Sequence, residues 1–456
     1  MKKLAKRTFA SLMVVALFLA GFSIFLVQYF IKGPDWAAFP VNRHVYNSDG
    51  ILATGIVVDR NGDVLAYVND SKRMFSPDYS TRRATLHVVG DAEGNIGTGL
   101  LSSFDSELMG YSITGVYSIS GQGNTVHSTI DAGLCVTAYN ALGNRNGTVV
   151  VVNYKTGDIM CMVSAPGFDP SSPPDLSDDQ QGTKYEGAYI NRAVSSTFTP
   201  GSIYKIITLE AAVETIPDLW EREFYCPGEI EIGGDRITCT DRHGTIDIHN
   251  AFARSCNVAF AELALEVGAD NIRKYADKAG LLDSFKMSGI PVAAGSYDMA
   301  AAGTADLAWS GIGQYNDLVN PLAQARFMAA IANGGSCVNP RIVYSVTTPL
   351  GIPTGLYGSG AKHRLMSSGT AETITAMMRY NTTSFYGEWR FPGLELCAKS
   401  GTAEVGEGKT PHAWFVGFLD DPDNPYAFAV FVENGGWGIS AAGEVANKVL
   451  QHAVTL

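Results

Sequence analysis

The sequence predicts a protein of the α/β (α+β) class that is anchored in a membrane by one N-terminal helix. Three features predict this: an uncharged run at Thr8–Ile31, apolar runs of strand type at both ends of residues 126–456, and helical patterns between them. Strands at both ends of a helical middle indicate a sheet in which the first and last strands come together. With 456 residues, the chain can form two or three domains of roughly 150 residues each.

The composition excludes two classes of protein. Lys and Arg number 33 against 45 Asp and Glu, so the net charge is −12. Phosphate binding needs a basic face, so nucleic acid is not expected to be the main partner. Hydrophobic residues make up 46% and charged residues 17%. Intrinsic disorder requires the opposite balance and is therefore excluded.

The N-terminal segment predicts a single membrane anchor. Four basic residues in positions 1–7 precede the uncharged run, which as a helix is long enough to cross a hydrocarbon core of about 30 Å. The basic flank favours a cytoplasmic tail at 1–7, an anchor at 8–31 and a cell-membrane protein whose remaining residues are extracytoplasmic. A cleaved signal peptide is the alternative. The run is longer than a typical signal core, and no clear A-x-A site follows it before Lys32.

Residues 33–125 predict a small, mostly β module. The apolar runs at 55–58 and 64–67 flank Asn61-Gly62, and Asn-Gly between alternating apolar residues is a strong hairpin signal.

Residues 126–456 alternate between strand and helix patterns. Asp131 is a suitable cap for a helix that ends near Leu142. The elements expected after it are two strands joined by a turn at 155–158, a loop at 166–182, a helix from Ser202, a hairpin at 225–240, helices at 250–282 and 321–333, strands at 395–401, 413–419 and 426–434, and a helix at 440–452.

The seven cysteines are too few for a disulfide scaffold, and no CxxC motif occurs. Cys226 and Cys239 flank Gly233-Gly234, where the sequence predicts a hairpin tip, and in an exported domain they are expected to form a disulfide. Cys256 is expected to stay reduced. Two reduced thiols, or a metal pair joined by His243, are the alternatives.

The first motif that carries chemistry is Ser202-x-x-Lys205, which follows Pro200-Gly201 at the predicted start of a helix. Lys205 lies one turn beyond Ser202 on the same face, and a lysine kept from water can lose its proton and act as a base for a serine. By itself, the pattern also fits a capping serine and a surface lysine. Ser359-x-x-Lys362 repeats the pattern without a helix.

Two further motifs follow along the chain. Ser255-x-Asn257 is expected in a turn, since residues i and i+2 do not share a helical face, and a helix N-cap is the alternative interpretation. Lys399-Ser400-Gly401-Thr402 is expected on a strand, where a glycine lets a ligand approach the backbone. Lys155-Thr156-Gly157 has the same form but precedes Ser202, and it is interpreted as a turn only.

The three motifs in this order resemble the signature of the penicillin-recognising serine enzymes. Over about 125–456, the chain is similar to the transpeptidase domains of class B (monofunctional) penicillin-binding proteins. Flanking stretches share the resemblance, namely 191–193, 243–244, 311–314, 331–335 and 412–417. The resemblance implies a penicillin-binding/β-lactamase-like domain at 126–456, with an antiparallel sheet flanked by helices, on a pedestal at 33–125.

The resemblance also implies a D,D-transpeptidase that cross-links peptidoglycan stem peptides and binds β-lactams covalently. Ser202 is then the nucleophile, Lys205 is its base and Ser255 relays a proton. Asn257 is implied to hold Lys205 and an amide of the substrate. Lys399, with the hydroxyl groups of Ser400 and Thr402, is implied to bind the substrate carboxylate, beside Gly401. The backbone N–H groups of Ser202 and Thr402 are implied to form the oxyanion hole. No metal or other cofactor is expected. A membrane glycosyltransferase of the SEDS type is the implied partner, since about 95 residues before the domain do not hold a polymerase.

A β-lactamase, a D,D-carboxypeptidase and a β-lactam sensor are the related alternatives. A β-lactamase needs a group that activates water, and no loop carboxylate in the sequence is assigned to that role. A catalytically silent cell-wall scaffold is the alternative outside enzymes, and the three intact motifs argue against it.

Overall fold

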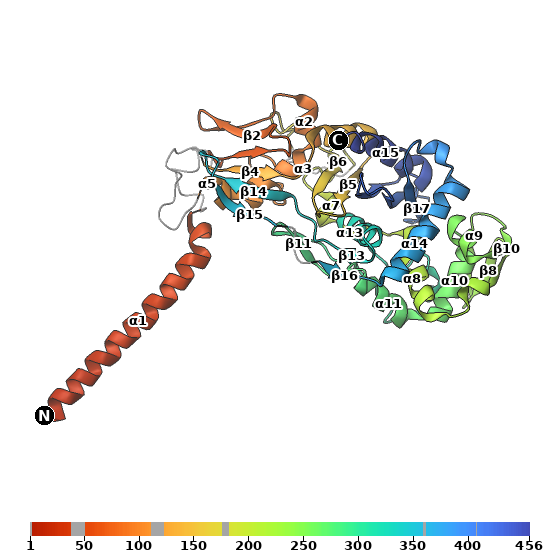
Figure 1. The fold of residues 1–456 in the computed structure, drawn as a ribbon, viewed down its shortest axis with the longest axis horizontal. Coiled ribbons are helices and arrows are strands. Elements are labelled where there is room, and N and C mark those ends of the chain that lie inside the picture. The colour runs from red at the N-terminus through yellow and green to blue at the C-terminus, as the bar shows by residue number, and fades with distance from the viewer. Residues whose placement is uncertain (1, 38–50, 111–122, 176–181, 359–361, 407) are drawn as a thin grey trace.

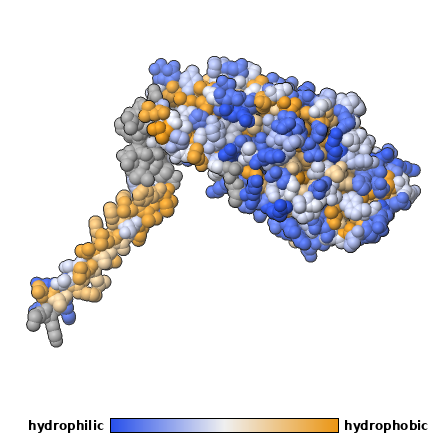
Figure 2. All heavy atoms as spheres, in the orientation of Figure 1, coloured by the Kyte–Doolittle hydropathy of each residue, from blue (hydrophilic) through white to orange (hydrophobic). Residues whose placement is uncertain are grey.

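The computed structural model describes residues 2–37, 51–110, 123–175, 182–358, 362–406 and 408–456. Its first element is α1 (Lys2–Ala37), which extends away from the body of the molecule (Figure 1). Its segment Lys3–Gly33 is long and apolar enough to cross a membrane, and no other helix among the described residues is. Figure 2 shows apolar residues along this helix, and none of its most apolar stretch is buried.

A five-stranded antiparallel sheet forms the centre of the larger part of the molecule. Its strand order is β17-β18-β19-β5-β6, with bounds β17 (Leu396–Ala403), β18 (His412–Leu419), β19 (Tyr426–Val432), β5 (Gly147–Asn153) and β6 (Ile159–Ala165). β19 pairs with β5, so the strands from the two ends of the domain come together as predicted. Every residue of β19 and β6 is buried, because helices cover the sheet.

Helices from distant parts of the chain pack on this sheet. α6 (Ala132–Leu142) begins where the carboxylate of Asp131 accepts a hydrogen bond from the amide of Leu134 at 2.8 Å, which confirms the predicted cap. α6 packs against α15 (Gly438–Ala453), and both contact the sheet. A second group, α13 (Pro321–Ala332) and α14 (Ser368–Asn381), also packs on the sheet. These contacts confirm the prediction of an antiparallel sheet flanked by helices.

The helical middle holds the elements that carry two of the motifs. They are α7 (Arg192–Ser195), the 3₁₀ turn η1 (Gly201–Tyr204), α8 (Lys205–Thr215), the 3₁₀ turn η2 (Leu219–Glu221), α9 (Ile248–Ala253), α10 (Asn257–Val267), α11 (Ala269–Lys278) and α12 (Thr304–Ser310). Short two-stranded sheets join them: β7 (Glu223–Cys226) with β10 (Gly244–Asp247), β8 (Glu229–Ile232) with β9 (Asp235–Thr238), and β11 (Phe285–Met287) with β12 (Ile290–Val292).

A second sheet contains the strands of the N-terminal module. Its order is β15-β14-β4-β1-β2-β3, with bounds β15 (Pro353–Leu356), β14 (Val343–Thr347), β4 (Thr125–Ser128), β1 (Ile56–Val58), β2 (Val64–Asn69) and β3 (Lys72–Phe75). β1 and β2 form the hairpin predicted at Asn61-Gly62. Two features were not predicted: β14 and β15 join from far along the chain, and the module also holds α2 (Tyr79–Ala84), α3 (Leu86–Val89), α4 (Leu100–Ser103) and α5 (Asp105–Met109).

The structure contradicts the predicted Cys226–Cys239 disulfide, because all seven cysteines are free thiols. The hairpin tip at Gly233-Gly234 is present, but its register explains the error. β8 and β9 pair Glu229 with Thr238, whereas Cys226 belongs to β7 and pairs with Gly244 of β10. The two cysteines are therefore not cross-strand partners, and Cys239 lies beside Cys256 instead.

Candidate active site

The first motif lies at the junction of η1 and α8, as predicted. Ser202 is in the 3₁₀ turn, and Lys205 is the first residue of α8. The Lys205 amine is 3.1 Å from Ser202 Oγ. Gly201 has a φ of +55°, and a Cβ there would lie 2.6 Å from the carbonyl oxygen of Thr402. Only a glycine therefore lets this turn approach the strand that carries the third motif.

The second motif is in a turn between α9 and α10, also as predicted. Ser255 has a φ of +56°, in the left-handed region that non-glycine residues rarely occupy. Cys256 caps α10, and Asn257 is the first residue of that helix. The turn brings three oxygens to Lys205 Nζ: Asn257 Oδ1 at 2.6 Å, Ser255 O at 2.7 Å and Ser255 Oγ at 3.1 Å.

The third motif is on β17, as predicted, and it completes a chain of polar contacts. Lys399 Nζ donates to Ser255 Oγ and to the carbonyl oxygen of Ser400, both at 3.0 Å. The Ser255 hydroxyl thus lies between two lysine amines. The structure therefore brings Ser202, Lys205, Ser255 and Lys399 into one continuous sequence of contacts.

Burial controls the charge of both lysines. Each side chain is fully buried, and the hydrogen-bond acceptors named above are hydroxyl, amide and carbonyl oxygens. Burial lowers the pKa of Lys205 to about 8, an effect that the nearby Cys239 and Cys256 partly offset. Burial, and then the charge of Lys205, lower the pKa of Lys399 well below its usual value. Both effects follow from the cost of a charge away from water.

Close packing fixes the far end of the third motif. A Cβ on Gly401 would lie 2.9 Å from Ile203 Cγ2 and 2.9 Å from the carbonyl oxygen of Pro200. The Thr402 hydroxyl accepts a hydrogen bond from the amide of Gly438 at 3.3 Å. The hydroxyl groups of Ser400 and Tyr386 are 3.0 Å apart, and Tyr386 accepts from the Ser400 amide at 2.8 Å.

The three motifs open onto one cleft of about 320 Å³. The cleft is lined by residues of all three motifs and by further side chains, among them Ser202, Ser255, Asn257, Ser400, Thr402, Trp309, Gln314, Phe385, Tyr386, Glu404 and Trp437. A larger cavity of about 670 Å³ is lined by Tyr79, Arg83 and Tyr139 and contains none of the motifs. Cavity volume therefore does not identify the active site, whereas the two buried lysines with lowered pKa values do.

The repeated motifs do not reach the cleft. Lys155 is exposed on the turn between β5 and β6, as predicted. Lys362 is also exposed, and Ser359 lies outside the described residues. Sequence reasoning missed Tyr386, Phe385 and Trp437. Tyr386 ends the π-helical turn Thr382–Tyr386, and no pattern around these isolated aromatic residues distinguishes them from core or surface residues.

Comparison with known proteins places this geometry in a family. The penicillin binding protein transpeptidase domain matches residues 147–451. The chain belongs to the penicillin-binding protein transpeptidase family. It is 30% identical over 425 residues to the peptidoglycan D,D-transpeptidase PbpA of Mycolicibacterium smegmatis, and the match covers 85% of each chain.

Other members of the family share the sequence or the fold. The stage V sporulation protein D of Bacillus subtilis is 30% identical over 317 residues, which cover 66% of this chain and 47% of that protein. Penicillin-binding protein A of M. tuberculosis, solved as a ceftriaxone acyl-enzyme complex, superposes with a TM-score of 0.76 and 25% identity, over 91% of this chain and 99% of that one. The domain class and the acyl-transfer chemistry predicted from the motifs are thus confirmed.

Proposed function

We propose that this chain is a peptidoglycan D,D-transpeptidase in which Ser202 forms the acyl-enzyme. Ser202 Oγ attacks the penultimate carbonyl of a D-alanyl-D-alanine stem peptide, a C–O bond forms, the C–N bond breaks and D-alanine leaves. An amine of a neighbouring strand then takes the acyl group and frees Ser202. The observation that carries this proposal is the unbroken chain of contacts from Ser202 through Lys205 and Ser255 to Lys399.

Lys205 is the general base in this proposal. With a pKa of about 8, it is neutral in about a tenth of the molecules near pH 7, and its lone pair then accepts the Ser202 proton at 3.1 Å. Asn257 Oδ1 and the Ser255 carbonyl oxygen accept hydrogen bonds from the Lys205 amine and hold it beside Ser202. Ser255, in contact with both lysines, relays a proton to the leaving amine.

The strand β17 binds the substrate. The hydroxyl groups of Ser400 and Thr402 line the cleft beside the buried amine of Lys399, and together they bind the terminal carboxylate. Gly401, which lies between them, is not among the residues that line the cleft, and its missing side chain lets η1 pack closely against β17. The backbone N–H groups of Ser202 and Thr402 form the oxyanion hole, where the loss of one donor typically costs about 10²–10³ in rate.

We further propose that α1 anchors the chain in the cell membrane, with residues 1–7 in the cytoplasm and the catalytic domain outside. The basic residues before the apolar stretch support this orientation. In this arrangement residues 33–125, joined by β14 and β15, form a pedestal that holds residues 126–456 away from the membrane. A membrane glycosyltransferase of the SEDS type is the proposed partner that supplies glycan strands.

Labelling with a fluorescent penicillin tests the function against its alternatives. A transpeptidase stays labelled, a β-lactamase releases the label quickly, and a silent scaffold takes no label. Glu404 is the one carboxylate among the described residues that line the cleft, so release is measured in the wild type and in Glu404→Gln. Fast release that Glu404→Gln abolishes would identify a β-lactamase. Incubation with a stem peptide and an amine acceptor then separates transpeptidation from carboxypeptidation.

A further inference from the structure

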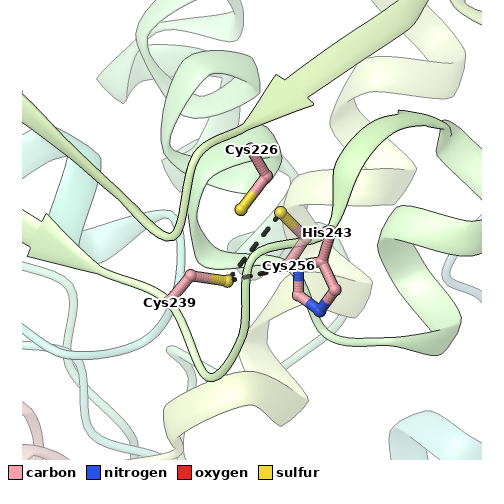
Figure 3. Close-up of side chains that lie close together, drawn as sticks. All are labelled: Cys226, Cys239, His243 and Cys256. Atoms are coloured by element: carbon pink, nitrogen blue, oxygen red, sulfur yellow. Dashed lines mark hydrogen bonds between the residues drawn. The ribbon is translucent and has the colours of Figure 1, made fainter.

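Three cysteines and a histidine meet directly beside the second motif (Figure 3). Cys226 ends β7, Cys239 follows β9, His243 precedes β10 and Cys256 caps α10. One ligand atom from each residue lies within 4.8 Å of all the others. The end of β7, the loop between β9 and β10, and the start of α10 therefore direct three sulfurs and one ring nitrogen toward a common centre.

The distances between the ligand atoms fit a tetrahedral zinc site. With Zn–S of about 2.3 Å and Zn–N of about 2.0–2.1 Å, the edges of a regular tetrahedron are about 3.8 Å between two sulfurs and about 3.6 Å between sulfur and nitrogen. Cys239 Sγ is 3.9 Å from Cys256 Sγ and 3.5 Å from His243 Nδ1. A disulfide needs its sulfurs about 2 Å apart. The arrangement is thus the size of a metal site.

The surroundings favour thiolates and enclose the centre. Cys226 and Cys256 are fully buried, and Cys239 and His243 are partly exposed. Backbone amides donate to two of the sulfurs, from Asn257 to Cys239 at 3.2 Å and from Ala259 to Cys256 at 3.5 Å. Such amide contacts stabilise metal-bound sulfur in the way that outer hydrogen bonds generally support metal ligands.

We propose that Cys226, Cys239, His243 and Cys256 bind one Zn²⁺ in a closed site that holds the Ser255–Asn257 turn in its catalytic position. A Cys₃His set with four protein ligands is typical of structural zinc. The four side chains are positioning residues, because none of them is among those that line the catalytic cleft. This inference replaces the metal-free site expected from the sequence.

The link to the catalytic motif is short. Cys256 lies between Ser255 and Asn257, and Cys239 accepts from the amide of Asn257. The Asn257 side chain donates to the carbonyl oxygen of Thr238, the neighbour of Cys239, at 2.8 Å. A metal at this centre therefore ties the β8–β9 hairpin to a turn in which Ser255 has a strained left-handed backbone. Its removal frees the two groups that hold Lys205.

Zinc content tests the site independently of the proposed function. The full chain, purified in reducing detergent buffer without a chelator, should contain about one zinc per molecule. His243→Ala and Cys226→Ser should lose it, and His243→Cys should keep it, because four thiolates also bind zinc. Cys337→Ser is the matched control, since Cys337 is another buried free cysteine, placed in β13 (Ser336–Cys337). Metal-free wild type, or zinc retained by His243→Ala, would overturn the proposal.

Metal exchange in the wild-type protein tests the same site without any substitution that could prevent folding. Replacement by Co²⁺ should give the strong near-ultraviolet sulfur-to-metal absorption of thiolate ligands, and a spectrum without it contradicts the site. A Cys226–Cys239 disulfide, found by peptide mapping without reduction, would also contradict the metal site. Chelation should slow penicillin acylation about 10–100-fold, and Zn²⁺ should restore it. If zinc is bound but the intact protein is never acylated, the proposed function fails while the metal site stands.

Discussion

The hydroxyl of Ser255 lies 3.1 Å from Lys205 Nζ and 3.0 Å from Lys399 Nζ, and this contact joins three motifs that are far apart in the sequence. Two amines this close repel each other when both are charged, and both are buried. The site therefore favours states in which at least one lysine is neutral. A neutral lysine beside a serine is what general-base activation requires.

The protonation of Lys205 predicts a pH profile. The neutral amine is the base, so activity is lost as the pH falls through the pKa of about 8. The rate constant for penicillin acylation should rise about tenfold per pH unit below that value and level off above it. Stopped-flow labelling measures this. Lys205→Arg, which stays charged, should acylate very slowly at every pH, and a flat wild-type profile from about pH 6 to about pH 9 contradicts the assignment.

Two lysines in similar triplets give a matched pair of variants. Lys399→Ala should lower the acylation rate at least about a hundredfold, because it removes the amine that contacts Ser255 and binds the carboxylate in a site partly shielded from water. Lys155→Ala should change the rate by less than about threefold, as is usual for an exposed turn residue. Both rates are measured with the same penicillin. Equal losses would show that the role assigned to β17 is wrong.

At the scale of elements, the site depends on how closely η1 approaches β17. Gly401→Ala places a methyl group 2.9 Å from Ile203 Cγ2 and from the Pro200 carbonyl. Overpacking of this kind usually costs about 1–3 kcal/mol, and we expect a lower melting temperature and an acylation rate reduced about tenfold or more. Gly97→Ala is the control, because nothing lies within 4 Å of its added Cβ. An unchanged acylation rate in Gly401→Ala would contradict the close fit.

The sequence predicted the elements that local patterns define and missed those that need distant partners. The Asn61-Gly62 hairpin, the Asp131 cap and the buried strands all have local signals, and the structure has them. β14 joins β4 from more than two hundred residues away, and no local pattern specifies that pairing. The same holds for Cys226 and Cys256, which meet only because β7 and α10 converge. A prediction based on the hairpin alone therefore paired the wrong cysteines.

For the molecule as a whole, α1 stands apart from the rest of the fold, and its apolar window has no buried residues. Exposed apolar area of this extent is stable in lipid rather than in water. Expressed in bacteria, the full chain should remain in the membrane fraction after washing with high salt. A chain that begins at residue 51 should be soluble and should still bind penicillin within about threefold of the normal rate. A soluble full chain would contradict the anchor.

Mass spectrometry of the penicillin-treated protein is the most direct test of the central claim, which is that Ser202 carries the acyl group. The account predicts one penicillin adduct per chain, located on the peptide that contains Ser202 and absent from a folded Ser202→Ala variant. Circular dichroism of the variant checks the fold. An adduct on Ser359, or an unchanged adduct in Ser202→Ala, would contradict the account.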